Sequence, residues 1–264
     1  MDANFKKCKA GLIGCLLLFT LGKANAMSYS YVWHINDLLT ADTDTIHLTS
    51  SHDKSLKKVE RKQLIYLYSV AKAMEEVAET DSMLFIVDGG EFANAFAGRK
   101  RLSINSEKAK ISYRKYRGKK TAYMQGTTFF RYTDNETTQV FNVIGINFKM
   151  LDMLGTDVHM AAALIGHELA HLRLDHAAEH KDKPSRHEQD VNTARYRRDN
   201  EREADYLGII WAVEAGYDPE GAVRLRDNPI RKRGACRGYC ITHPLSVERI
   251  MKSKSLARRL SRDN

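Results

Sequence analysis

The chain has 264 residues, of which 43% are hydrophobic and 28% are charged. This composition is typical of a globular protein and excludes disordered, fibrous and collagen-like chains. The length suffices for one domain, or two small ones, with a hydrophobic core that is stable without disulfides or metal ions. Because the first 26 residues hold four lysines and one aspartate, the remainder carries 38 basic against 32 acidic residues. That remainder is only mildly basic.

Residues 1–26 have the pattern of an export signal. A lysine-rich start precedes an apolar run at residues 11–21, and the small triplet Ala-Asn-Ala follows at residues 24–26. We expect cleavage after this triplet, which leaves a single domain over residues 27–264 in the bacterial periplasm. An uncleaved anchor is less favoured, because the apolar run is well short of the roughly 20 residues that a spanning helix needs. Lipid attachment at Cys15 is disfavoured too, since the apolar run continues beyond it.

Two cysteines, Cys236 and Cys240, remain after the signal. In an oxidising compartment such a pair favours a disulfide. Helical spacing would hold the two Cα atoms near the upper limit for a bridge, but Gly234 and Gly238 indicate a loop that can bend. We expect a local disulfide, with free thiols or a metal site shared with His243 as the alternatives.

The hydrophobic periodicity predicts an α+β domain, mostly helical, around a small antiparallel or mixed sheet. An amphipathic helix is expected over residues 54–80, a buried strand over 83–87, another strand over 140–146, and a helix from Asp157. The stripe that predicts the first helix consists of Leu56, Val59, Gln63, Leu67, Ala71, Met74, Val77 and Ala78.

Residues 99–139 alternate basic runs with aromatic residues in strand-like stretches. Such interleaving can bind single-stranded nucleic acid. A twisted hairpin with solvated lysines is the favoured interpretation, because nucleic acid is not the usual partner of an exported protein. We therefore expect no nucleic-acid partner.

The motif HExxH occupies residues 167–171. Its histidines, His167 and His171, would stand one turn apart on one helix face, close enough to share a metal ion. Glu168 would point near the same ion without having to bind it. The apolar approach at residues 160–165 indicates a buried helix, which suits ligands that must be fixed and partly dehydrated.

A second histidine pair, His176 and His180, follows closely and carries Glu179 in the inverted HxxEH pattern. On one continuous helix His176 would lie about 180° around the axis from His167, at 100° per residue. The two pairs then could not face one site. We expect the second pair to be a solvated helix end, with adventitious metal affinity at most.

A catalytic zinc takes three protein ligands and leaves a position for water, so a third ligand should lie downstream. Glu201 and Asp205 are the candidates, because they share one face of a second expected helix, whereas Glu203 points elsewhere. One carboxylate can bind the metal while the other accepts the distal N–H of a ligand histidine. The alternative is a charged first turn that the helix dipole favours.

Together with Asn-Ala-Phe-Ala at residues 94–97 and Thr-His-Pro-Leu-Ser-Val-Glu-Arg at 242–249, these motifs resemble the forty-eighth metallopeptidase family, that of HtpX, BepA and the CaaX prenyl protease. The resemblance covers roughly residues 55–250. It implies a gluzincin metalloprotease domain with an HExxH active-site helix and a small sheet.

The resemblance also implies the roles of individual residues. One Zn²⁺ per chain would be held by His167, His171 and Glu201, with Asp205 as the partner of a ligand histidine. A histidine in the Thr-His-Pro segment lies near the metal in BepA-like relatives, so His243 is implied as a fourth ligand or a gate.

The charges indicate the chemistry of such a site. Zinc lowers the pKa of its bound water toward about 7, and Glu168 can take that proton as the water attacks a peptide carbonyl. The oxyanion donor stays open among His243, Tyr239 and a backbone group. We expect an exported zinc endopeptidase for quality control. Its polypeptide substrates, unfolded envelope or outer-membrane proteins, would add as a strand at a sheet edge near residues 140–146.

Two alternatives belong to other classes of protein. One is a holdase-like protein that binds exposed strands while His243 keeps the zinc site closed. The other is a surface-binding module whose basic tail, residues 252–259, docks on anionic membrane lipid or polymer. Intact ligand spacing argues against the second, because its HExxH would be vestigial.

Overall fold

The structure, a computed structural model, describes residues 32–49, 56–88, 93–103, 111–126, 138–176, 189–233 and 246–263. The expected signal and the segment that contains Cys236, Cys240 and His243 lie outside these residues. Within the described residues, no helix is long and apolar enough to cross a membrane.

The first sheet has the strand order β1-β4-β8-β5. Its strands are β1 (Val32–His34), β4 (Met83–Val87), β8 (Thr138–Asn147) and β5 (Ala95–Ser103). The central pair, β4 and β8, is parallel, and both outer pairs are antiparallel. The strands predicted over residues 83–87 and 140–146 are therefore confirmed. However, β8 is an inner strand, so the expectation of an open edge at residues 140–146 is wrong.

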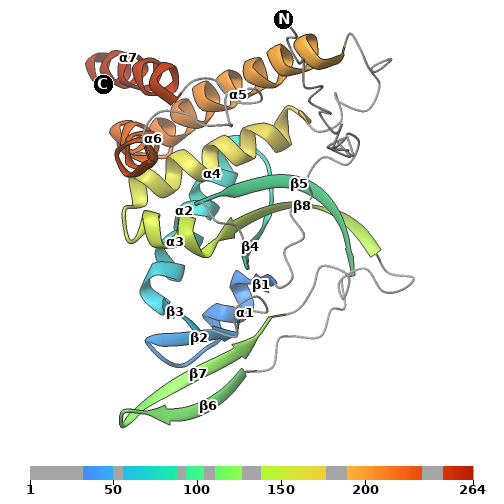
Figure 1. The fold of residues 1–264 in the computed structure, drawn as a ribbon, viewed down its shortest axis with the longest axis vertical. Coiled ribbons are helices and arrows are strands. Elements are labelled where there is room, and N and C mark those ends of the chain that lie inside the picture. The colour runs from blue at the N-terminus through green and yellow to red at the C-terminus, as the bar shows by residue number, and fades with distance from the viewer. Residues whose placement is uncertain are drawn as a thin grey trace, which may run out of the picture.

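A second mixed sheet has the order β3-β2-β7-β6, so the described part of the chain forms two sheets where the sequence predicted one. Its strands are β2 (Thr45–Thr49), β3 (Leu56–Glu60), β6 (Ile111–Tyr116) and β7 (Lys119–Gln125). Strands β6 and β7 form the antiparallel hairpin that the basic aromatic segment predicted. In Figure 1 this hairpin lies at the end of the molecule away from the helical layer.

The helices are α1 (Ile35–Leu39), α2 (Arg61–Ala78), α3 (Phe148–Leu154), α4 (Val158–Arg173), α5 (Gln189–Glu214), α6 (Glu220–Arg233) and α7 (Ser246–Asp263). Figure 1 shows α5, α6 and α7 as an outer layer, with α4 between that layer and strands β5 and β8. Helix α4 packs against α2, α5 and α6 and also against β5. It is the central helix of the domain.

The first long helix begins at Arg61, not at residue 54 as the apolar stripe predicted. Residues 56–60 instead pair with β2 as an antiparallel strand. The apolar stripe misled because Val59 is buried in the strand as well, between the exposed Lys58 and Glu60. Over only five residues, the apolar positions of an alternating strand can also fit one face of a helix, so the pattern does not distinguish the two.

Helices α4 and α5 cross in direct backbone contact at Gly166 and Gly208. A Cβ atom built on Gly166 would lie 2.6 Å from the carbonyl oxygen of Gly208, and one on Gly208 would lie 2.6 Å from the backbone nitrogen of His167. No side chain fits between the helices at this point. The crossing therefore brings the backbone of α5 next to the HExxH turn.

Candidate metal centre

Helix α4 begins where the sequence predicted. The side chain of Asp157, its N-cap residue, accepts hydrogen bonds from the backbone N–H groups of His159 and Met160. This satisfies two of the helix's otherwise unpaired donors. Every residue from 160 to 170 is buried, so His167 and Glu168 lie in the protein interior.

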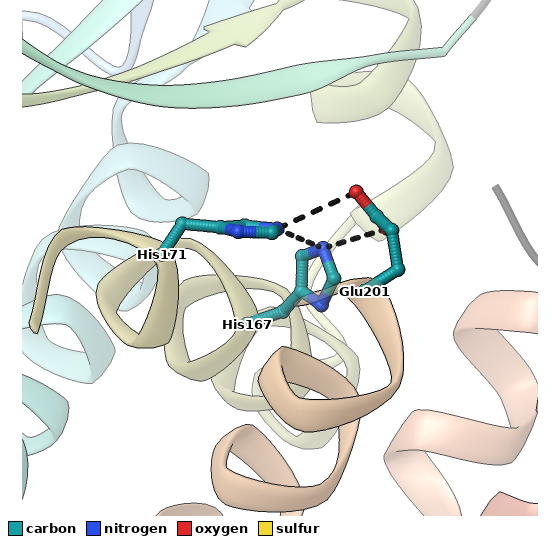
Figure 2. Close-up of side chains that lie close together, drawn as sticks. All are labelled: His167, His171 and Glu201. Atoms are coloured by element: carbon teal, nitrogen blue, oxygen red, sulfur yellow. Dashed lines mark hydrogen bonds and ion pairs between the residues drawn. The ribbon is translucent and has the colours of Figure 1, made fainter. Parts of the chain in front are cut away.

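The donor groups of three side chains from α4 and α5 point toward one another (Figure 2). The Nε2 atoms of His167 and His171 are 3.1 Å apart. The carboxylate oxygens of Glu201 lie 3.5 Å from each of them, Oε2 from His167 and Oε1 from His171. Among the described residues, these three form the one group of His, Cys, Asp and Glu side chains that could hold a metal ion.

The spacing of these donor groups fits zinc. Ligand atoms about 2.1 Å from a tetrahedral ion are separated from one another by about 3.4 Å. The separation of the two imidazole nitrogens, 3.1 Å, is close to that value, and each nitrogen lies 3.5 Å from a different oxygen of the Glu201 carboxylate. One donor atom from each of the three residues lies within 4.8 Å of the other two. Two imidazoles and one carboxylate are also the donor set of many catalytic zinc sites with an open fourth position.

Asp205 lies one helical turn beyond Glu201 and contacts the far side of His167, with its Oδ1 atom 2.9 Å from His167 Nδ1. Arg249 of α7 donates two hydrogen bonds of 2.6 Å to the same carboxylate, and Arg226 of α6 donates a further one. Burial alone would raise the pKa of Asp205, but the charges of Arg226 and Arg249 outweigh it and hold the pKa well below its usual value. Asp205 is thus a fixed anion behind His167.

The two histidines differ in their affinity for a proton. Burial and the neighbouring charge of His167 lower the pKa of His171 to about 3. His171 therefore keeps a free lone pair at neutral pH. Burial also acts to lower the pKa of His167, but the hydrogen-bonding partner Asp205 and the charge of Glu201 raise it overall.

The expectation of a solvated end at the second histidine pair is wrong for His176. Helix α4 ends at Arg173, so the helix is not continuous and the 180° separation does not apply. His176 is buried, and its Nδ1 atom lies 2.8 Å from Nδ1 of His171. The other histidine of the second pair, His180, and the intervening Glu179 lie outside the described residues.

Nothing in the sequence indicated that Arg226 and Arg249 lie beside the site, and a solvated helix end was predicted for His176. The motif at residues 242–249 contributes to the family resemblance and points to His243, but it assigns no role to Arg249. Arg226 lies on α6 in a run of alternating charges that gives no sign of burial. His243, Tyr239 and the cysteine pair lie outside the described residues, so their predicted roles stay predictions.

Residues 188–257 match the model of peptidase family M48. This match shows that the segment is similar to family M48. It spans roughly a quarter of the chain and includes Glu201, Asp205 and Arg249, but it does not extend to the HExxH residues. No curated protein shows significant similarity to the chain.

The similarity to family M48 agrees with the chemistry of the site, because the peptidases of this family are zinc-dependent. The His167, His171 and Glu201 side chains offer the donors that zinc prefers. Both lines of evidence support a zinc-dependent metalloprotease.

Proposed function

We propose that the chain is an exported zinc endopeptidase that binds one zinc ion through His167, His171 and Glu201. The observation that carries the proposal is the convergence of two imidazole nitrogens and one carboxylate at the separations of a zinc coordination shell. Family M48 supplies an independent reason to expect a metalloprotease.

Each residue of the site has a separate task. When bound, zinc supplies a Lewis acid and lowers the pKa of a water molecule. Glu168, buried on the same helix turn, accepts the proton of the attacking water and delivers it to the leaving amine. Asp205 orients the imidazole of His167, and Arg226 and Arg249 keep Asp205 ionised.

Substrate would bind in extended form along β5. This strand is the edge of the first sheet among the described strands, since it pairs with β8 on one side. It packs against α4, the helix that carries two of the three donor residues, and runs across the upper part of the view in Figure 2. Addition of a strand at a sheet edge requires an extended chain, which favours unfolded substrates over folded ones.

The compartment suggests the physiological substrates. The signal pattern at residues 1–26 directs the protein to the cell envelope, where unfolded or misassembled envelope proteins, including outer-membrane proteins, present extended segments. A quality-control peptidase that recognises backbone rather than particular side chains fits an edge-strand site.

The decisive variant is Glu168→Gln, tested for zinc content and for cleavage of casein, an unstructured substrate. We expect the variant to retain zinc while hydrolysis falls about 10²- to 10⁴-fold, because the base is lost and the ligands remain. Glu76→Gln, at an exposed position on α2, is the matched control and should cleave like the wild type. Activity of Glu168→Gln within a few fold of the wild type would place the base elsewhere. A zinc-loaded wild type that binds casein without cleaving it would favour the holdase function instead.

A further inference from the structure

The contact between His171 and His176 has no role in the function proposed so far. Their Nδ1 atoms are 2.8 Å apart, a hydrogen-bonding distance. His176 is only 5% exposed although it follows the end of a helix. We propose that His176 is a positioning residue of the zinc site, which accepts the Nδ1–H of His171 and thereby directs the Nε2 lone pair of His171 to the metal.

The helix end itself builds this contact. The backbone N–H of His176 donates to the carbonyl of His171, and that of Asp175 donates to the carbonyl of Leu172. Asp175 has the left-handed φ of 53°. These three features define a Schellman motif, which turns the chain back over the last helical turn. His171 and His176 are therefore joined twice, by backbone and by side chain.

The direction of the side-chain hydrogen bond follows from the other end of each ring. His171 Nε2 faces His167 and Glu201, so it must be unprotonated for His171 to bind a metal. The proton of neutral His171 then sits on Nδ1, and His176 Nδ1 must be the acceptor. The proton of His176 is left on Nε2, which lies 3.6 Å from the Glu203 carboxylate.

This arrangement parallels the one behind the other ligand. Asp205 contacts the distal nitrogen of His167, and His176 contacts the distal nitrogen of His171. The site already contains the carboxylates of Glu168, Glu201 and Asp205. An imidazole acceptor fixes the second ring without adding another negative charge.

The inference rests on the proposed function, because it requires His171 to be a zinc ligand. Zinc affinity is measured by competition with a chromophoric chelator, on protein that comprises residues 27–264. Loss of a group that orients a ligand histidine typically weakens metal binding 10- to 100-fold. We expect that loss in His176→Ala. His176→Asn should stay within about threefold of the wild type, because its Oδ1 atom replaces Nδ1 as acceptor.

Two further variants test Glu203. Glu203→Gln should weaken zinc binding less than His176→Ala, since Glu203 is half-exposed and acts only through His176. Glu214→Gln, exposed on the same helix, is the control and should bind zinc like the wild type. Wild-type affinity in His176→Ala, or an affinity of His176→Asn as poor as that of His176→Ala, would overturn the proposal. A wild-type protein that binds no zinc would instead refute the proposed function.

One measurement needs no substitution and decides the matter if His176→Ala does not fold. Long-range ¹H–¹⁵N spectra of the zinc-loaded wild type at about pH 8 report which ring nitrogen of each histidine carries a proton. We expect His171 to be protonated on Nδ1 and His176 on Nε2. A proton on Nδ1 of His176 would exclude it as the acceptor.

Discussion

Replacement of Gly208 by alanine tests whether the helix crossing sets the geometry of the metal site. The added Cβ would lie 2.6 Å from the backbone nitrogen of His167, and ordinary contact begins at 3.4 Å. Helices α4 and α5 must therefore separate by about 0.8 Å, because backbone atoms cannot turn aside as a flexible side chain can. Metal–ligand distances tolerate only about 0.2 Å. Glu201, two turns away on α5, should then lie too far from His167 for both side chains to bind the same ion.

Two opposing effects determine the stability of Gly208→Ala. Alanine gains about 1 kcal/mol over glycine in helix propensity. Overpacking of a core costs about 1 to 3 kcal/mol, and a clash with backbone belongs at the upper end. We expect a net loss of about 1 to 2 kcal/mol in the free energy of unfolding and at least a tenfold loss of zinc affinity.

Chemical denaturation of the zinc-free protein measures the first quantity, and chelator competition measures the second. Gly98→Ala is the control, because a Cβ there meets nothing within 4 Å. Gly166→Ala should act like Gly208→Ala, and the double variant should lose less than the sum, since both substitutions open the same gap. A Gly208→Ala protein with wild-type stability and zinc affinity would refute the role of the crossing.

Three other substitutions have separate consequences. Glu201→Ala should lose bound zinc by metal analysis, whereas Glu214→Ala, exposed on the same helix, should keep it. Burial tends to raise the pKa of Asp157, but hydrogen bonds, chiefly from Arg224, lower it overall, so its charge stabilises the fold above the unfolded pKa of about 3.9. The difference in unfolding free energy between wild type and Asp157→Asn should therefore shrink as the pH falls from 6 to 2. A pH-independent difference would contradict this. Asp175→Val places a β-branched residue at φ 53° and should cost about 1 to 2 kcal/mol and weaken zinc binding, whereas Asp175→Gly should not.

Local patterns in the sequence predicted the elements that carry the candidate ligands. The N-cap of α4 at Asp157 and the helical spacing of HExxH and ExxxD depend only on neighbouring residues. Strand order depends on pairing between distant segments. The placement of β8 inside its sheet, where an edge was expected, follows from its pairing with β5, from which 34 residues separate it.

The sequence did not predict the residues that contact the candidate site from behind, for a different reason. Arg226 and Arg249 come from two further helices, and only the packing of those helices on α5 places both beside Asp205. His176 was misjudged because a continuous helix was assumed. Aspartate adopts the left-handed conformation more readily than most residues, so Asp175 was a local sign that the helix could end there.

The segment that matches family M48 and the HExxH motif lie in different parts of the chain. Their proximity in the structure is therefore evidence that does not come from either segment alone. The match begins at residue 188 and includes Glu201 and Asp205, whereas His167 and His171 precede it. Neither segment alone holds three metal ligands. The structure joins them through the glycine crossing, with Glu201 3.5 Å from both imidazoles and Asp205 2.9 Å from the distal nitrogen of His167. If the spacing of the two histidines on α4 were a coincidence, contacts with both Glu201 and Asp205 would not be expected. The contacts on both sides of His167 are therefore the strongest physical argument that the two motifs form one site.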